Sequence, residues 1–347
     1  MTPVLLPRAL ALAIALHLAL PAPSACAQPS ERSRWLMGTL FTLRGERAED
    51  SNALDAALDH VAALESRLSN WRPASELSRL NATGSADDAS EPLRAVLDSA
   101  LVLAELTQGA FDPSVEPLTR VWDLRGAGRA PDAHELAAAR SRVDWRRVRL
   151  TGSSVSLGGA LLDLGGVGKG FALDRAAAVL RERGVRAATL DAGGQLLLLG
   201  DDECATWVAH PARRDTPAAR VVFAGGSLST SSQSERFVRA AGRRIGHILD
   251  PRSGQPLATR ASVSVWAASG TRADALSTGL LVLGREAAGA FAAAHPEIGV
   301  LWLEPAGRRV RAHAWNLVVP EVAPFVSLTL HHPEVASAPL SPLTRKP

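Results

Sequence analysis

Hydrophobic residues recur at helical spacing in several stretches of the chain. In 52–71, Leu54, Leu58, Val61 and Leu64 lie three or four residues apart, as on the apolar face of an amphipathic helix. Other stretches show the same spacing next to start or stop residues such as Pro131 and Gly109. The pattern predicts helices at 52–71, 92–109, 131–142, 170–184 and 272–284.

Shorter apolar runs, many with alternating polar positions, predict strands between these helices. The stretch 154–166 predicts a hairpin or two strands meeting at Gly158 and Gly159, and 109–124 predicts a proline-broken loop. Because strands and helices do not alternate strictly, the pattern favours an α+β fold over a doubly wound sheet. Strands are predicted at 35–45, 185–194, 195–200, 206–211, 219–225, 226–232 and 260–269, with a final hairpin at 299–305 and 309–315.

The N-terminus predicts export. Arg8 precedes a 12-residue apolar run (9–20), which is short for a membrane span and typical of a signal peptide. Ala25-Cys26-Ala27 then fits a cleavage site before Gln28. Alternatively, Cys26 carries a lipid after cleavage, although the preceding Pro23 does not suit a lipidation motif. We therefore expect a periplasmic protein, soluble or lipid-anchored, in which Cys204 has no internal disulfide partner.

Composition narrows the function only a little. With 347 residues and 46% hydrophobic content, the chain can form a substantial core. A formal charge of +3 and the lack of a sustained basic stripe give no support to nucleic-acid binding. Lysine is more informative: 38 residues are lysine or arginine, and only Lys169 and Lys346 are lysines. Lys169 is either a chance survivor or a compact cation in a glycine-lined slot that would exclude arginine.

Lys169 belongs to the segment "LDLGGVGKGFALD", which precedes a predicted helix. The segment fails the Walker A pattern because Gly170 follows the lysine, and it fails G-x-G-x-x-G because Phe171 takes the last position. Glycines before a helix can still bring backbone N–H groups close to an anion such as phosphate. Asp163 could receive a polar edge of the same ligand. The alternative is tight strand–helix packing beside a solvated lysine.

Two further motifs offer chemistry. Asp274 and Thr278 are four residues apart in a predicted helix and share a face. Their oxygens suit Mg²⁺, or Asp274 caps the helix. His247 lies in a turn before Asp250 and is either a proton acceptor or a structural residue. No zinc-type Cys/His spacing or G-x-S-x-G motif occurs, and "GGSLSTSSQS" is hydroxyl-rich without matching either.

Seven ordered blocks resemble the FAD:protein FMN transferase (ApbE-like) family. The resemblance covers roughly 35–304, and its blocks are "MGTLF", "SNWRPASELSRLN", "GAFDPSVEPLTRVW", "LDLGGVGKGFALD", "DAGG", "GHILDPRSGQP" and "ADALSTGLLVLG". It implies a two-lobed mixed α/β body of T-fold-like architecture with FAD in the cleft. It also implies Mg²⁺-dependent cleavage of FAD, attachment of FMN to a threonine of an exported or membrane redox protein, and release of AMP.

The resemblance also implies residue roles. Lys169 would face phosphate, and Trp71 would stack on a ring of FAD where the family usually has tyrosine. His247 would take the threonine proton, and Asp274 would act in catalysis as a cation ligand. The FAD-binding residues would be Met37, Trp71, Ala110, Phe111, Asp112, Asp163, Lys169, His247 and Ile248. The Mg²⁺ ligands would be Gly166 (through its carbonyl), Asp274 and Thr278.

Two other functions fit the same motifs. The protein could be a Mg²⁺-dependent FAD pyrophosphatase, or an exported FAD-binding protein without catalysis. The intact Asp274/Thr278 pair weighs against mere storage of FAD. The expected domain plan is a signal peptide (1–27), a linker (28–34), a transferase domain (35–319) and a proline-rich C-terminal extension (320–347) with no assigned role.

Overall fold

The computed structural model describes residues 29–240 and 242–331. The predicted signal peptide, including Cys26, lies outside the described residues, as does 332–347. Among the helices of the described part, none is long and apolar enough to cross a membrane.

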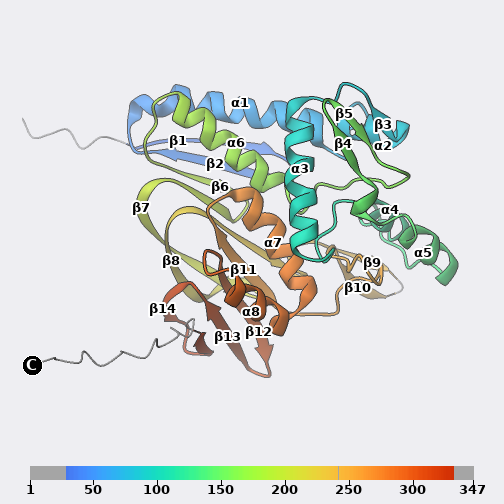
Figure 1. Ribbon diagram of the computed structural model, residues 1–347. Helices are drawn as coiled ribbons and strands as arrows, with labels where there is room; N and C mark the ends of the chain where they lie inside the picture. Colours follow the sequence, from blue (N-terminus) through green and yellow to red (C-terminus); the bar gives the residue numbers. More distant parts are fainter. Residues whose placement is uncertain (1–28, 241, 332–347) are drawn as a thin grey trace, which may run out of the picture.

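A ten-stranded mixed sheet runs through the molecule (Figure 1). Nine strands follow one another as hydrogen-bonded neighbours, and the tenth, β14 (Val318–Val322), pairs with β8 beside that path. All neighbours are antiparallel except the last two, which are parallel. The order is β1 (Ser30–Leu36), β2 (Thr39–Gly45), β6 (Ala188–Ala192), β7 (Gln195–His210), β8 (Arg213–Ser232), β11 (Ser262–Ala267), β12 (Gly299–Ala306), β13 (Arg309–Trp315) and β15 (Val326–His331).

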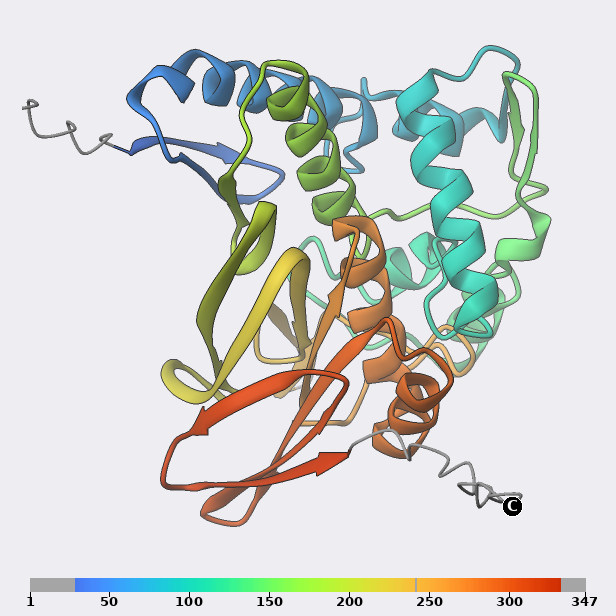
Figure 2. The same ribbon diagram turned by 60° about the vertical axis from the view of Figure 1, so that its left-hand side comes forward.

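Helices cover one face of this sheet (Figures 1 and 2). The helix α1 (Ser51–Leu68) packs against β1, β2 and α6 (Gly168–Glu182), while α7 (Gly270–Leu283) packs against α6, β8 and β11. The helices α3 (Glu91–Leu106) and α8 (Arg285–Ala294) flank α7. The remaining elements are η1 (Ala48–Asp50), α2 (Glu76–Thr83), β3 (Ser85–Ala86), α4 (Glu116–Val121), α5 (Ala133–Arg140), η2 (Trp145–Arg147), β4 (Arg149–Thr151), β5 (Ser154–Ser156), β9 (Phe237–Ala240) and β10 (Arg243–Gly246).

Both faces of the sheet are buried at β12. Val300 and Trp302 belong to the large core under the helices, whereas Leu301 and Leu303 belong to a second core on the opposite face. Residues of β7, β8, β13, β14 and β15 complete that second core. Burial on both sides explains why this strand is continuously apolar in sequence, without alternation.

The helices α6 and α7 approach each other unusually closely at Gly170 and Gly270. A Cβ atom at Gly170 would lie 2.0 Å from the Gly270 carbonyl oxygen, and one at Gly270 would lie 2.7 Å from the Gly170 carbonyl oxygen. Only glycine permits such backbone contact. Two aspartates reinforce it: Asp174 of α6 accepts hydrogen bonds from Gly270 N (2.7 Å) and Thr271 N (2.9 Å), and Asp274 Oδ2 of α7 accepts one from Gly170 N (3.0 Å). Each helix thus caps the amino end of the other.

The structure confirms the α+β class and the five predicted helices, with small shifts at their ends. Strand prediction was less accurate. The strand expected at 35–45 is a hairpin that turns at Met37 (φ 51°) and Gly38 (φ 74°). The apolar run continues through this turn, so periodicity could not show it.

Other differences have similar causes. The expected loop at 109–124 contains α4, which begins at Glu116 next to Pro117 in a position where helices tolerate proline. After Gly158–Gly159 no second strand forms, and Leu161 makes an isolated bridge to Val115. The segments 206–211 and 219–232 are parts of the long strands β7 and β8. The hairpin at 299–315 is not the last element, because β14 and β15 follow.

The expected bounds of the transferase domain, 35 and 319, fall inside elements of the one sheet. The strand β1 already begins at Ser30, and β15 continues to His331 beside β13.

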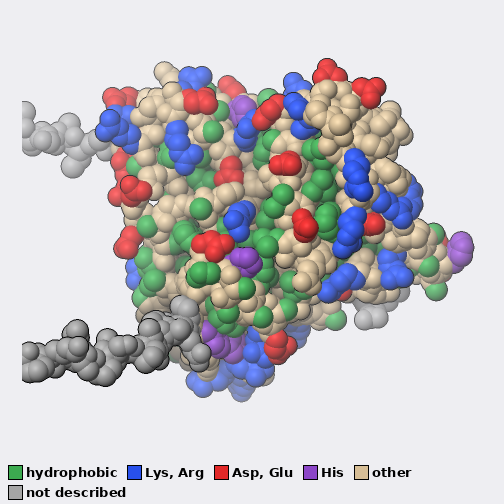
Figure 3. Space-filling view, viewed as in Figure 1, with side chains coloured by type: hydrophobic (Ala, Val, Ile, Leu, Met, Phe, Trp, Pro, Cys, Tyr) green, Lys and Arg blue, Asp and Glu red, His purple; other side chains and the backbone are tan. Residues whose placement is uncertain are grey.

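The face seen in Figure 3 carries acidic and basic side chains interspersed over most of its area, with basic ones more frequent toward the edge near β4 and α5.

The α6–α7 contact predicts different effects on stability for alanine substitutions at two nearby glycines of α6. Gly170→Ala should lower stability by about 1–3 kcal/mol, because the new methyl group overlaps the Gly270 backbone. Gly168→Ala, two residues earlier in the same helix, would meet Met37 Cε at 3.5 Å, an ordinary contact. It should leave stability unchanged or raise it slightly, because alanine favours helix. Chemical denaturation measures both, and equal effects would contradict the close-contact interpretation.

Candidate functional site

A cavity of about 870 Å³ opens between the helices and the sheet. Its walls come from the β1–β2 turn, the segment after α1, the glycine segment before α6, the strand β8 and the helix α7. All the predicted site residues line it: Met37, Trp71, Ala110, Phe111, Asp112, Asp163, Gly166, Lys169, His247, Ile248, Asp274 and Thr278. The fold therefore gathers segments that are more than 200 residues apart in sequence. The volume lies in the range of small-molecule and cofactor sites.

Asp274 lies at the point where α6 crosses α7. The residue is 4% exposed, and its carboxylate has Oδ2 held by the Gly170 N–H and Oδ1 3.5 Å from Lys169 Nζ. The amino end of α7 is capped instead by Ser269, whose Oγ accepts from Arg272 N (3.3 Å), and by Asp174. Asp274 therefore does not cap its own helix, which removes that alternative.

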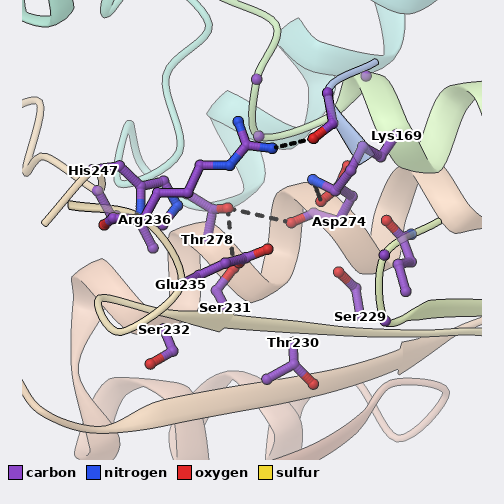
Figure 4. Close-up of a pocket in the computed structure, with 18 of the residues that line it drawn as sticks. Lys169, Ser229, Thr230, Ser231, Ser232, Glu235, Arg236, His247, Asp274 and Thr278 are labelled. Carbon is purple, nitrogen blue, oxygen red and sulfur yellow. Dashed lines mark hydrogen bonds and ion pairs between the residues drawn. The ribbon is translucent and has the colours of Figure 1, made fainter. Parts of the chain in front are cut away.

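The glycine segment meets Thr278 directly. A Cβ atom at Gly166 would lie 3.3 Å from Thr278 Oγ1. Gly170 lies in the first turn of α6, where backbone N–H groups have no acceptor within the helix, and its N–H donates to Asp274. The Gly166 carbonyl precedes the helix and accepts no backbone hydrogen bond in the described part of the chain, so it is available to a ligand. Figure 4 shows the other two oxygen donors, Asp274 and Thr278, together on α7.

These donors fit a hard divalent cation. A carboxylate, a hydroxyl and a backbone carbonyl are oxygen ligands of the kind that Mg²⁺ takes, with further positions left to phosphate oxygens or water. In 29–240 and 242–331 no group of three or more His, Cys, Asp and Glu side chains gathers as a metal cluster. The site is consistent with that finding, because only one of its three protein donors is of those types.

His247 lies across the cavity from Lys169 in Figure 4. Its Nδ1 is 3.1 Å from the Arg236 carbonyl oxygen. Because a carbonyl only accepts, Nδ1 carries the hydrogen in the neutral ring, and Nε2 keeps a free lone pair. Burial lowers the pKa of His247 below its ordinary value of 6.5, and the nearby Glu235 carboxylate opposes that shift only in part.

The backbone next to His247 is fixed by one side chain. Ile248 is buried, its N–H donates to Gln233 Oε1 (3.0 Å), and its carbonyl accepts from Gln233 Nε2 (2.7 Å). This paired amide contact holds the loop against the end of β8. The Arg236 guanidinium donates to the Gly38 carbonyl (3.2 Å), which links the same loop to the β1–β2 turn.

Asp163 is held by an ion-pair network that the sequence did not reveal. Its Oδ2 accepts from Arg125 (2.7 Å) and Thr119 Oγ1 (3.2 Å), and its Oδ1 accepts from Gly165 N (2.8 Å). Arg125 also forms a two-pronged pair with the buried Glu116. Its guanidinium carbon lies 5.7 Å from the centre of the Trp71 ring, which is 63% exposed. Trp71 is therefore available for stacking, with a cation beside it.

The segment Ala110–Phe111–Asp112 forms a buried wall. The Phe111 ring lies against Gly166, and Asp112 is 7% exposed. The Asp112 carboxylate is occupied within the protein, since it accepts from Ser114 N (2.7 Å), Ser114 Oγ (2.6 Å) and Trp145 N (3.3 Å). Burial raises the pKa of this carboxyl group despite those hydrogen bonds. The segment therefore offers a ligand mainly its shape and backbone.

Met37 reaches the site from the β1–β2 turn, and its Cε lies 3.5 Å from the position of a Cβ atom at Gly168. Gln195 reaches it from β7. Its Nε2 donates to the Gly270 carbonyl (2.9 Å), while its buried Oε1 has no partner in the described part of the chain.

Among the cavity-lining residues that sequence reasoning missed are Arg125, Gln195, Ser231, Glu235 and Arg236. The hydroxyl-rich stretch "GGSLSTSSQS" was the one available signal, because serines at every second position of a strand share a face. Arg125 gave no signal, since arginine is common in this chain.

The chain is similar in sequence and in fold to known proteins. The ApbE family model matches 37–302. A Treponema pallidum protein named "FAD:protein FMN transferase" is 35% identical over 315 residues, which cover 82% of this chain and 86% of that protein. The crystal structure of the ApbE protein from Thermotoga maritima superposes with a TM-score of 0.73 at 25% identity, covering 85% of this chain and 96% of that chain. The flavin transferase ApbE from Vibrio cholerae gives 0.72 at 26% identity, covering 83% and 97%.

The environment of His247 predicts an acid-shifted titration. Because burial disfavours the charged ring, the imidazole should stay neutral as the pH falls through 6.5 and take up a proton only below it. NMR of ring-labelled histidine in the ligand-free protein measures the midpoint, and His247→Gln identifies the resonance. A midpoint at or above 6.5 would contradict the burial argument.

Proposed function

This chain belongs to the ApbE family, and we propose that it transfers FMN from FAD to a threonine hydroxyl of another protein and releases AMP. The observation that carries the proposal is the meeting of Gly166, Asp274 and Thr278 in one cavity with Lys169 and His247. Relatives and structural neighbours named as flavin transferases support the same reaction.

Binding of the diphosphate depends on charge and backbone. Lys169 supplies a compact ammonium group beside Asp274, where the diphosphate of FAD would lie. A Mg²⁺ ion held by Asp274, Thr278 and the Gly166 carbonyl would offset phosphate charge and orient the phosphate oxygens. When the diphosphate binds, Lys169 exchanges its contact with Asp274 for phosphate oxygens.

The rings of FAD have one candidate stacking contact. Trp71 presents an exposed face beside the Arg125 guanidinium, which suits stacking with a heteroaromatic ring.

Transfer requires a base near the acceptor hydroxyl. His247 Nε2 has the free lone pair, because Nδ1 is committed to the Arg236 carbonyl. The threonine Oγ attacks the FMN phosphorus, its proton passes to His247 Nε2, and the bond to the bridging oxygen breaks so that AMP leaves. Since burial lowers the pKa of His247, the ring is neutral and ready to accept that proton at neutral pH.

We also propose that the protein acts outside the cytoplasm, on an exported or membrane-bound redox protein. The basic residue, short apolar run and Ala25-Cys26-Ala27 site at the N-terminus support export, with Cys26 as the alternative point of lipid attachment. An acceptor in the same compartment would meet the enzyme after both are exported.

Incubation with FAD, Mg²⁺ and a threonine-bearing acceptor protein tests the function. Mass spectrometry should show an acceptor gain equal to one FMN on threonine, with AMP released in equal amount. Free FMN without modified acceptor would show hydrolysis instead. FAD that stays intact for hours would show binding without catalysis.

Replacing the cation ligand should stop the reaction without loss of the fold. Asp274→Asn keeps an oxygen for the Gly170 N–H but removes the negative charge. We expect AMP release to fall by about 10²–10³-fold, since metal stabilisation of the transition state contributes several kcal/mol. Asp98→Asn, on the surface of α3, is the matched control. Unchanged AMP release by Asp274→Asn would refute the ligand assignment.

A further inference from the structure

A row of serines lies on the face of β8 that packs under α7. Ser227, Ser229 and Ser231 occupy every second position and are 0%, 3% and 7% exposed. Leu228, between them, belongs to the second core on the opposite face of the sheet. Buried positions in a central strand are ordinarily apolar, so three hydroxyl groups here require hydrogen-bond partners.

The serine nearest the cation ligands is Ser231. Its Oγ lies 2.8 Å from Ser277 Oγ and 3.3 Å from Thr278 Oγ1, and both partners are on α7. Figure 4 shows Ser231 below Thr278, joined to it by a dashed line, with Asp274 on the same helix. Ser231 therefore connects the central strand to one of the three proposed cation ligands.

The contacts fix the direction of each hydroxyl hydrogen. Ser277 Oγ donates to the Asp274 carbonyl at 2.9 Å, the usual bond of a serine within a helix, and the alternative acceptor, Ser229 Oγ, is farther away at 3.4 Å. Since Ser277 has one hydroxyl hydrogen, Ser231 donates in its 2.8 Å contact with Ser277. With its own hydrogen used, Ser231 can only accept from Thr278 Oγ1.

This chain of bonds begins and ends at the same turn of α7, running from Thr278 to Ser231, then to Ser277 and to the Asp274 carbonyl. Thr278 has one competing acceptor, the Asp274 carbonyl at 3.4 Å, which already receives the Ser277 hydrogen at a shorter distance. The hydroxyl hydrogen of Thr278 is thus directed toward the sheet. The lone pairs of Thr278 Oγ1 are left free on the cavity side.

We propose that Ser231 is a positioning residue that holds the Thr278 hydroxyl with its lone pair toward a cation bound at Asp274. The proposal rests on the cation site of the proposed function. A hydroxyl ligand binds a cation through its oxygen lone pair, so a hydrogen turned into the cavity would oppose binding. Outer hydrogen bonds of this kind orient ligands and change metal affinity by about 10–100-fold.

The test measures cation affinity separately from activity. Mn²⁺ binding is followed by electron paramagnetic resonance, with saturating FAD and no acceptor protein. Ser231→Ala should raise the Kd for Mn²⁺ about tenfold, while FAD affinity measured in EDTA stays the same. Ser231→Thr restores a hydroxyl at this position and should return the Kd to within about threefold of the unsubstituted value.

Ser229→Ala is the matched control. It removes a hydroxyl from the same face of the same strand, and Ser229 contacts Ser277 at 3.4 Å but has no hydrogen bond to Thr278. The Kd for Mn²⁺ should change less than twofold. An equal loss in Ser229→Ala and Ser231→Ala would indicate general packing and overturn the proposal.

The remaining outcomes separate this proposal from the proposed function. Equal Mn²⁺ affinity in Ser231→Ala and the unsubstituted protein overturns the role of Ser231 alone. Failure of the unsubstituted protein to bind Mn²⁺ overturns both the cation site and Ser231. A tenfold effect of Ser231→Ala in a protein that transfers no FMN would support the positioning role and refute the transferase function.

Discussion

The crossing of α6 and α7 at Gly170 and Gly270 is the constraint on which the site depends. The two backbones touch, and each helix gives an aspartate to the amino end of the other, Asp174 in one direction and Asp274 in the other. Asp274 receives the Gly170 N–H, which has no acceptor within the first turn of α6, and Gly166, just before that helix, lies against Thr278. One packing contact thus places a carboxylate, a carbonyl and the nearby Thr278 hydroxyl together.

Two strands of the sheet, β7 and β8, hold the α6–α7 crossing in place. The strand β8 presents small hydroxyl side chains to α7 where larger apolar ones would push the helix away, and Gln195 of β7 donates to the Gly270 carbonyl at the crossing point. The serines cost little space, and their desolvation is offset by bonds to one another and to α7. Polar groups in the centre of the fold therefore set both the position of α7 and the direction of the Thr278 Oγ1 lone pairs.

The cavity brings together two differently built groups of residues. Asp163, Glu116 and Arg125 form a charged network beside the exposed Trp71. His247 lies in a loop held by Gln233 and Arg236. Residues on either side of His247 pack in one apolar cluster with Leu118 and Trp122 from the α4 region, so a common support holds both groups beside the same cavity.

Sequence alone determined five of the helices, the α+β class and the residue types of the site, but it did not show α2, α4 or α8. Local periodicity specifies a helix such as 52–71. In short motifs such as "ADALST", the residues with reactive or metal-binding side chains are close together in sequence and can be recognised directly. Tertiary structure alone decided the turn at Met37, the length of β8, the Arg125 network and the partner of Asp274. These depend on contacts between segments far apart in the chain, such as Gly170 with Gly270, and a hydrogen bond or steric overlap between such segments leaves no periodic trace in either one.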